Sequence, residues 1–268
     1  MRFAPAPEGD ARLPYSALGV GAGRTFDVYG KDAQRARGLL VRDALDRGID
    51  LFATSPSAGE GERVLGAALI GVRRRAYVMV SYDDPDETEI QRQIDRSLHL
   101  FDGWIDLLAV DWRSLSRTLI VGMRRMRDTE DALDIGIACR TVRDLIKAAP
   151  AAVELQLDFL TLPATTLLHG DCDRPLDRLA RAGLDVIARV PDGLESIAAE
   201  ASQGERALNL GRYKLTSYRD VLFKLATSDP RVTAVTAPAR RGRDLDALEA
   251  IAATPPLSRT EMLALRTA

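Results

Sequence analysis

Short apolar runs alternate along the chain with longer segments in which apolar residues recur every three or four positions. The segment 31–47 places Leu39, Leu40 and Ala44 on one face, as in an amphipathic helix. The short runs have the length of buried strands. The predicted strands are 16–21, 49–54, 76–82, 105–111, 134–139, 153–158, 184–190 and 232–237, and the predicted helices are 31–47, 61–71, 88–100, 115–126, 142–148, 176–182, a region ending near 227, 245–253 and one from 259.

Eight strand–helix units follow one another with no linker between them. This order predicts an α/β protein whose parallel strands close into a (β/α)8 TIM barrel covered by helices. A doubly wound open sheet is the alternative, which the absence of Gly-x-Gly-x-x-Gly after any predicted strand disfavours. We expect residues 1–268 to form a single barrel domain, with an N-terminal β-hairpin at 2–15 and a lid at 192–219.

Composition and charge narrow the classes of partner. The 268 residues are 46% hydrophobic and 28% charged, as in ordinary globular proteins. The formal net charge of −2 gives no electrostatic basis for binding nucleic acid. No apolar run approaches the roughly 20 residues of a membrane helix, and residues 1–10 lack the apolar core of a signal peptide. Two cysteines do not make a disulfide framework. We therefore expect a cytoplasmic protein with a small-molecule ligand, and its oligomeric state stays open.

A series of short motifs resembles the aldo/keto reductase family. The segment 48–66 is similar to the family's second-strand segment, Gly-Ile-Asn-Phe-Phe-Asp-Thr-Ala followed by Tyr-Gly, Ser-Glu and Leu-Gly. The residues that keep this frame are Gly48, Ile49, Phe52, Thr54, Gly59, Glu62, Leu65 and Gly66. Other segments resemble the family in the same order, namely 16–21, 97–108, 135–137, 156–159, 186–191, 229–232 and 239–241. The resemblance implies a barrel fold. It also implies the family's reaction, which is hydride transfer from NADPH.

The resemblance also assigns four catalytic positions, and none of them keeps the family's residue. In the family a Tyr donates a proton during hydride transfer, assisted by Asp, Lys and His. Here the Asp position is Ala53, the Tyr position is Ala58, the Lys position is Tyr82 and the His position is Asp111. Without a positioned acid or cation, carbonyl reduction should lose several powers of ten in rate.

The cofactor site that the resemblance implies is incomplete. The family's Ser-Asn pair, which holds the nicotinamide carboxamide, reads Ala138-Cys139, whereas the Gln that shares this role is matched by Gln156. Arg240 and Arg241 remain available for a phosphate. We therefore expect no tightly bound cofactor, and NADP(H) is the one that the resemblance leaves open.

Polar residues at the predicted carboxyl ends of the strands could supply other chemistry, since barrel enzymes have their active sites there. We expect Tyr82 and Asp111 to point inward from neighbouring strands, with Asp111 as base and Tyr82 as acid or orienting donor in a proton transfer. The alternative is that both only fill an emptied pocket. The residues expected around a small anionic substrate are Trp112, Arg113, Cys139, Arg140 and Arg189.

The loop 169–173, His-Gly-Asp-Cys-Asp, holds side chains that can ligate a metal. It lacks the four well-spaced ligands of a structural zinc site, and Gly and Asp are common in turns. We interpret it as a turn and expect no metal.

Three functions stay open at this stage. The first, which we favour, is a non-redox enzyme of lyase, isomerase or dehydratase type acting on a small anionic metabolite. The second is an NADPH-dependent oxidoreductase with a non-standard proton donor. The third is a catalytically inactive protein that binds a small molecule or a partner. Whether the chain is an enzyme is not decided by its sequence.

Overall fold

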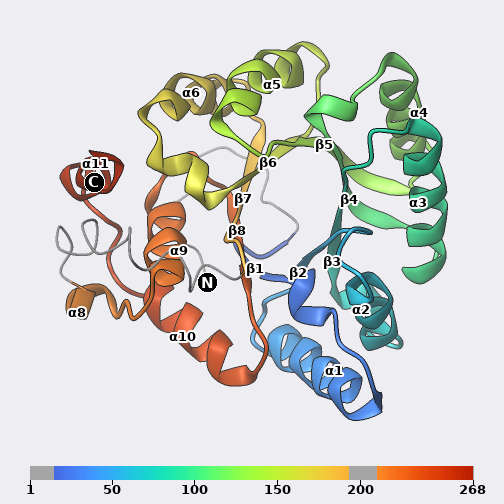
Figure 1. Ribbon diagram of the computed structural model, residues 1–268, viewed down its shortest axis with the longest axis horizontal. Helices are drawn as coiled ribbons and strands as arrows, with labels where there is room; N and C mark the ends of the chain where they lie inside the picture. Colours follow the sequence, from blue (N-terminus) through green and yellow to red (C-terminus); the bar gives the residue numbers. More distant parts are fainter. Residues whose placement is uncertain (1–14, 193–209, 268) are drawn as a thin grey trace.

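The computed structural model describes residues 15–192 and 210–267. Each of its eight parallel strands pairs with the next, and β8 pairs with β1, so the sheet is a closed barrel. Figure 1 shows the helices arranged around these strands. The predicted (β/α)8 barrel is confirmed, and the open sheet is excluded. The strands are β1 (Leu18–Gly21), β2 (Leu51–Thr54), β3 (Tyr77–Tyr82), β4 (Ile105–Asp111), β5 (Ala132–Ala138), β6 (Phe159–Pro163), β7 (Asp185–Arg189) and β8 (Ala234–Pro238).

Polar side chains in the sequence fix where several helices begin. Ser116 and Ser217 each accept a hydrogen bond from a backbone N–H of the helix that follows, and Thr141 forms a capping box with Asp144. The helices are α1 (Lys31–Asp46), α2 (Gly61–Leu69), α3 (Glu87–Leu100), α4 (Arg117–Asp128), α5 (Val142–Glu154), α6 (Asp173–Arg181), α8 (Leu210–Tyr213), α9 (Tyr218–Ser228), α10 (Gly242–Ala252) and α11 (Arg259–Thr267).

Short 3-10 turns complete the connections, and they are η1 (Arg24–Phe26), η2 (Arg73–Arg75), η3 (Trp112–Ser114), η4 (Ala164–Leu168) and η5 (Gly170–Cys172). In residues 15–192 and 210–267, no helix is both long and apolar enough to span a membrane. The predicted N-terminal hairpin lies outside the described residues except for Tyr15. Most of the lid predicted at 192–219 lies outside them as well, and its residues 210–219 form α8 and the start of α9. The single domain over residues 1–268 stays a prediction.

The sixth strand lies further along the chain than the sequence predicted. Residues 153–158 were expected to form it, but α5 continues to Glu154 and β6 begins only at Phe159. Pro150 normally favours the end of a helix because it removes a backbone donor. Here the apolar face of α5 continues past Pro150 to Ala152, so packing against the barrel overrides that preference.

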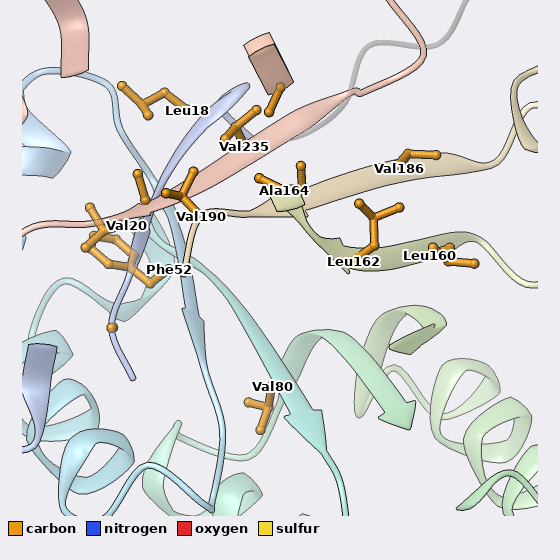
Figure 2. Packing of buried hydrophobic residues seen from close by; sticks show 14 of the residues in the cluster. Leu18, Val20, Phe52, Val80, Leu160, Leu162, Ala164, Val186, Val190 and Val235 are labelled. Atoms are coloured by element: carbon orange, nitrogen blue, oxygen red, sulfur yellow. The ribbon is translucent and has the colours of Figure 1, made fainter. Parts of the chain in front are cut away.

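Side chains alternate along each strand between the interior of the barrel and the layer that faces the helices. Figure 2 shows part of the outer layer, where Val20, Phe52 and Val80 are among the buried residues. Tyr82 and Cys139 belong to this outer layer as well. The interior forms a separate cluster of Tyr15, Leu51, Ala53, Met79, Leu107, Ala109, Ala138, Phe159, Ile187 and Ala234.

Polar side chains lie at the amino-terminal end of the barrel interior. The Tyr15 ring lies 5.9 Å from that of Tyr77, centroid to centroid, and its hydroxyl donates to the Asp185 carboxylate over 3.4 Å. Burial, followed by the negative charge of nearby aspartates, raises the pKa of Asp134 and of Asp185 to about 6. The charged form of these two carboxylates is therefore disfavoured in the folded state.

Replacing Asp185 by Asn should stabilise the fold at neutral and basic pH. The folded pKa of about 6 lies above the unfolded value of about 3.9, so the stability that Asp185 contributes is full below about pH 3.9 and is lost as the pH rises through 6. We expect the variant to exceed the parent in free energy of unfolding by about 1–2 kcal/mol at pH 8, and by clearly less at pH 5.

Urea denaturation at the two pH values measures this difference, with Asp171→Asn as the control at an exposed aspartate. An advantage of Asp185→Asn that is equal at pH 5 and pH 8 would contradict the explanation.

Candidate functional site

A cavity of about 330 Å³ opens at the carboxyl ends of the strands, in the mouth of the barrel. Its wall comes from β1, β2, β3, β7 and β8 and from the loops that follow them. Met79 and Ala53 lie at its inner part, because both also belong to the interior cluster. This end of a parallel barrel is where ligands usually bind.

Arg189, the last residue of β7, supplies a cation to this cavity. One of its guanidinium nitrogens, Nη2, donates to the carbonyl of Cys139 over 3.1 Å, whereas Nε is buried and has no hydrogen-bond partner. Within the part of the chain that the structure describes, Arg189 has no ion-pair partner. Burial lowers the pKa of its guanidinium.

Two hydroxyl groups share this lack of partners. Thr54 Oγ1 and Ser81 Oγ are both buried without a hydrogen bond, and both residues line the same cavity as Arg189. Buried polar groups without partners are uncommon in folded proteins, and a ligand or ordered water usually completes their bonding. Ser81 and Arg189 take inward positions on β3 and β7, whereas Thr54 follows the inward Ala53 and so points to the outer layer. The unpartnered atoms of Ser81 and Arg189 identify the cavity as the candidate binding site.

Asp111, at the end of β4, is held by two arginines instead of being available as a base. Its Oδ1 accepts from the backbone N–H and Nε of Arg113 over 2.9 and 3.0 Å. Its Oδ2 accepts from Arg113 Nη2 over 3.0 Å and from Arg140 Nε over 2.5 Å. Burial alone would raise the pKa of Asp111, but these hydrogen bonds outweigh it and lower the pKa. The prediction that Asp111 acts as a base is therefore not supported, since a lowered pKa makes its carboxylate a weak proton acceptor.

Tyr82 points away from the mouth, which corrects the prediction that it converges with Asp111. Its side chain is fully buried in the outer layer, near Ser97 of α3 and Glu62 of α2. Its hydroxyl faces Ser97 without a hydrogen bond of normal geometry. Burial raises its pKa well above the usual value. The physical reason is alternation along β3, since a shift of one residue turns a side chain to the opposite face. Ser81 takes the inward position.

The other predicted substrate residues lie at the rim or in the outer layer. Trp112 packs against the outer layer, and Arg113 is exposed beside Asp111. Arg140 joins Asp111 to Asp83, whose carboxylate it contacts at 3.0 Å. The Cys139 side chain is buried in the outer layer, where burial raises the pKa of its thiol. Of the five residues predicted around a substrate, only Arg189 lines the mouth cavity.

A second hollow of about 400 Å³ lies beside the amino end of α5, where Arg140, Arg143 and His169 contribute to its wall. The described residues contain no cluster of three or more side chains suited to a metal. In the loop 169–173, Cys172 is buried and Asp173 forms ion pairs with two arginines.

The residues expected to hold a cofactor do not come together. Gln156 is exposed in the turn before β6, at the end of the barrel opposite the mouth, with a φ of 52°. The guanidinium of Arg240 is bound to both carboxylate oxygens of Asp192 at 2.9 Å. The backbone N–H groups of Arg240 and Arg241 both donate to the Asp244 carboxylate, over 2.7 and 3.1 Å.

Comparison with known proteins gives a fold and no closer relationship. No protein-family model matches the chain, and no curated protein matches it. An aldo/keto reductase from Klebsiella pneumoniae, solved with NADP and acetate, is similar with a TM-score of 0.72 and 15% identity, over 94% of this chain and 90% of that one. An aldo-keto reductase from Bacillus halodurans in its holo form has a TM-score of 0.71 and 17% sequence identity, and the match covers 95% of this chain and 92% of that one.

A third structure, a proposed aldo-keto reductase from Pseudomonas aeruginosa, has a TM-score of 0.65 and 18% identity, over 98% of this chain and 96% of that one. These likenesses show that the chain has the fold of aldo/keto reductases, and at such identities they extend to the fold alone.

Substituting Tyr82 by Phe should be neutral or should stabilise the protein by up to about 1 kcal/mol, because it removes a buried hydroxyl that has no partner. Tyr213→Phe is the matched control, since the Tyr213 hydroxyl donates to Glu261 at 2.9 Å and its loss should cost about 1 kcal/mol. Thermal and urea denaturation measure both variants. Destabilisation of Tyr82→Phe equal to that of Tyr213→Phe would contradict this placement.

Proposed function

We propose that the chain is an aldo/keto-reductase-like barrel protein that binds a small anionic molecule, a carboxylate or a phosphate, on Arg189. The observation that carries this proposal is the pair of buried polar atoms without partners on Arg189 and Ser81, two residues that point inward and line one cavity. A guanidinium suits planar, bidentate recognition of carboxylate and phosphate. The volume of about 330 Å³ is at the small end for a ligand site, which favours a small metabolite.

The cavity supports binding better than turnover. Its described lining offers hydroxyl and guanidinium donors, and its one carboxylate, on Asp192, is engaged by Arg240. The two groups expected to move a proton are unsuitable, because Tyr82 lies behind the wall and Asp111 has its oxygens occupied by arginines. A carboxylate whose lone pairs are all taken and whose pKa is lowered is a poor general base. We therefore favour an inactive binding protein over the proton-transfer enzyme.

NADP(H) fits these residues poorly. The nicotinamide would need free donors and acceptors near the end of β5, yet the Cys139 N–H donates to Thr161 and its carbonyl accepts from Arg189. The amide groups that precede α10 are satisfied by Asp244. The proposed function therefore does not include NADP(H).

One cluster of cations favours a second candidate function, an NADP(H)-dependent oxidoreductase with a non-standard proton donor. Arg37 donates to the backbone carbonyl of Arg240 over 3.0 Å. Burial and then the positive charges of Arg240 and Arg241 lower the pKa of Arg37. Such a cluster would attract a phosphate group. NADP and NADPH are present in the complexes of the Klebsiella pneumoniae enzyme.

Replacing Arg189 by Met should weaken binding of a simple carboxylate, such as butyrate, by at least about tenfold, because a hydrogen bond to a charged group is worth roughly 1.5–3 kcal/mol. The variant should fold and melt no lower than the parent, since it removes a buried charge without an ion-pair partner. Isothermal titration calorimetry measures the affinity, and Arg178→Met on the exposed face of α6 is the control. Unchanged butyrate affinity in Arg189→Met, or a parent that binds neither carboxylates nor phosphates, would refute the proposal.

NADPH should bind with a dissociation constant above about 100 µM, because each missing hydrogen bond of roughly 1.4 kcal/mol weakens binding about tenfold. Fluorescence titration and calorimetry with NADPH and NADP⁺ measure this affinity. A low-micromolar constant would contradict the poor fit and would favour the oxidoreductase instead.

A further inference from the structure

A second cation stands at the outer end of the cavity that contains Arg189. Arg24, in the turn η1 after β1, lines the same cavity and is exposed. Asp27 lies three residues further along the chain, and its carboxylate accepts a hydrogen bond from the backbone N–H of Glu60 in the next loop over 3.0 Å. Among residues 15–192 and 210–267, no acidic side chain forms an ion pair with Arg24.

Much of the remaining cavity wall is small and uncharged. Gly21, Ala53, Thr236 and Pro238 are among the residues that line it. None of them carries a charge or a long side chain, so the space between the cations suits a short chain of carbon atoms. The unpartnered hydroxyl of Ser81, which points inward, also lies on a residue of this wall.

The carboxylate of Asp192 does not neutralise this pair of cations. It lines the cavity, but both of its oxygens accept from Arg240 at 2.9 Å. Arg24 and Arg189 therefore line one cavity, and within the described residues neither of them forms an ion pair. A ligand with one negative group at each end supplies a partner to both cations.

We propose that the ligand is a dianion with a short carbon chain, a dicarboxylate or a phosphorylated carboxylate. One anionic group binds Arg189 at the inner end of the cavity, and the other binds Arg24 at the rim. This inference rests on the proposed function of the cavity as an anion site and specifies the class of molecule that it takes.

The test compares dianions with monoanions of matched chain length. Succinate is set against butyrate, and phosphoglycolate against glycolate, by isothermal titration calorimetry on the parent, on Arg24→Gln and on Arg178→Gln as the control. We expect succinate or phosphoglycolate to bind the parent about fivefold or more tightly than its monoanion. The tighter of the two dianions distinguishes the dicarboxylate from the phosphorylated acid.

In Arg24→Gln, the favoured dianion should bind about three- to tenfold more weakly, whereas its matched monoanion should stay within about twofold of the parent. The control Arg178→Gln should change neither affinity. Raising the salt concentration from 20 to 200 mM should reduce the advantage of the dianion, because the contact at Arg24 is exposed and therefore screened.

Three other outcomes would contradict this inference, and one of them would also contradict the proposed function. If butyrate binds through Arg189 but no dianion binds more tightly than its monoanion, the inference fails and the proposed anion site stands. If Arg24→Gln weakens monoanions and dianions equally, the inference fails as well, because Arg24 then acts without regard to the second charge. If the parent binds neither class at millimolar concentration, both proposals fail.

Discussion

The closure of eight parallel strands into a barrel is the constraint on which the other features of this molecule depend. Closure gives each strand one face towards the interior and one towards the helices, and successive side chains alternate between them. On β3, Met79 therefore belongs to the interior cluster and Ser81 lines the mouth cavity, whereas Tyr82 packs behind the wall. A difference of one position decides whether a residue can reach a ligand.

The same geometry distributes the charges at the mouth. At the rim, Arg140 engages the carboxylate of Asp111 and Arg240 engages that of Asp192, so most rim charge is neutralised between neighbouring loops. Arg189 lies inside the wall, where it donates to the neutral backbone carbonyl of Cys139. An inward-facing cation without an ion-pair partner among the described residues favours an anion over a neutral or positive molecule.

The sequence allowed the count and order of the strands to be predicted, because each strand is a distinct apolar run between amphipathic helices. It did not place β6, since Pro150 suggested an early end to α5 and the residues after it alternate as a strand would. Arg189 could be identified by its position at a strand end. Thr54 and Ser81 could not, because a hydroxyl carries no distinctive chemistry, and only the register of the barrel and the burial of each oxygen mark them as unpartnered.

Buried donors without partners also determine how selective such a site can be. Each one lowers the stability of the fold by roughly 1–3 kcal/mol, which an acceptor on a ligand restores. A cavity of about 330 Å³ holds only a small molecule, so the apolar area that it can bury contributes little affinity. Discrimination must then come from hydrogen bonds and charge. A molecule of the same size without an anionic group leaves Arg189 buried and unpaired, and a site built on polar contacts rejects such an analogue more strongly than an apolar pocket would.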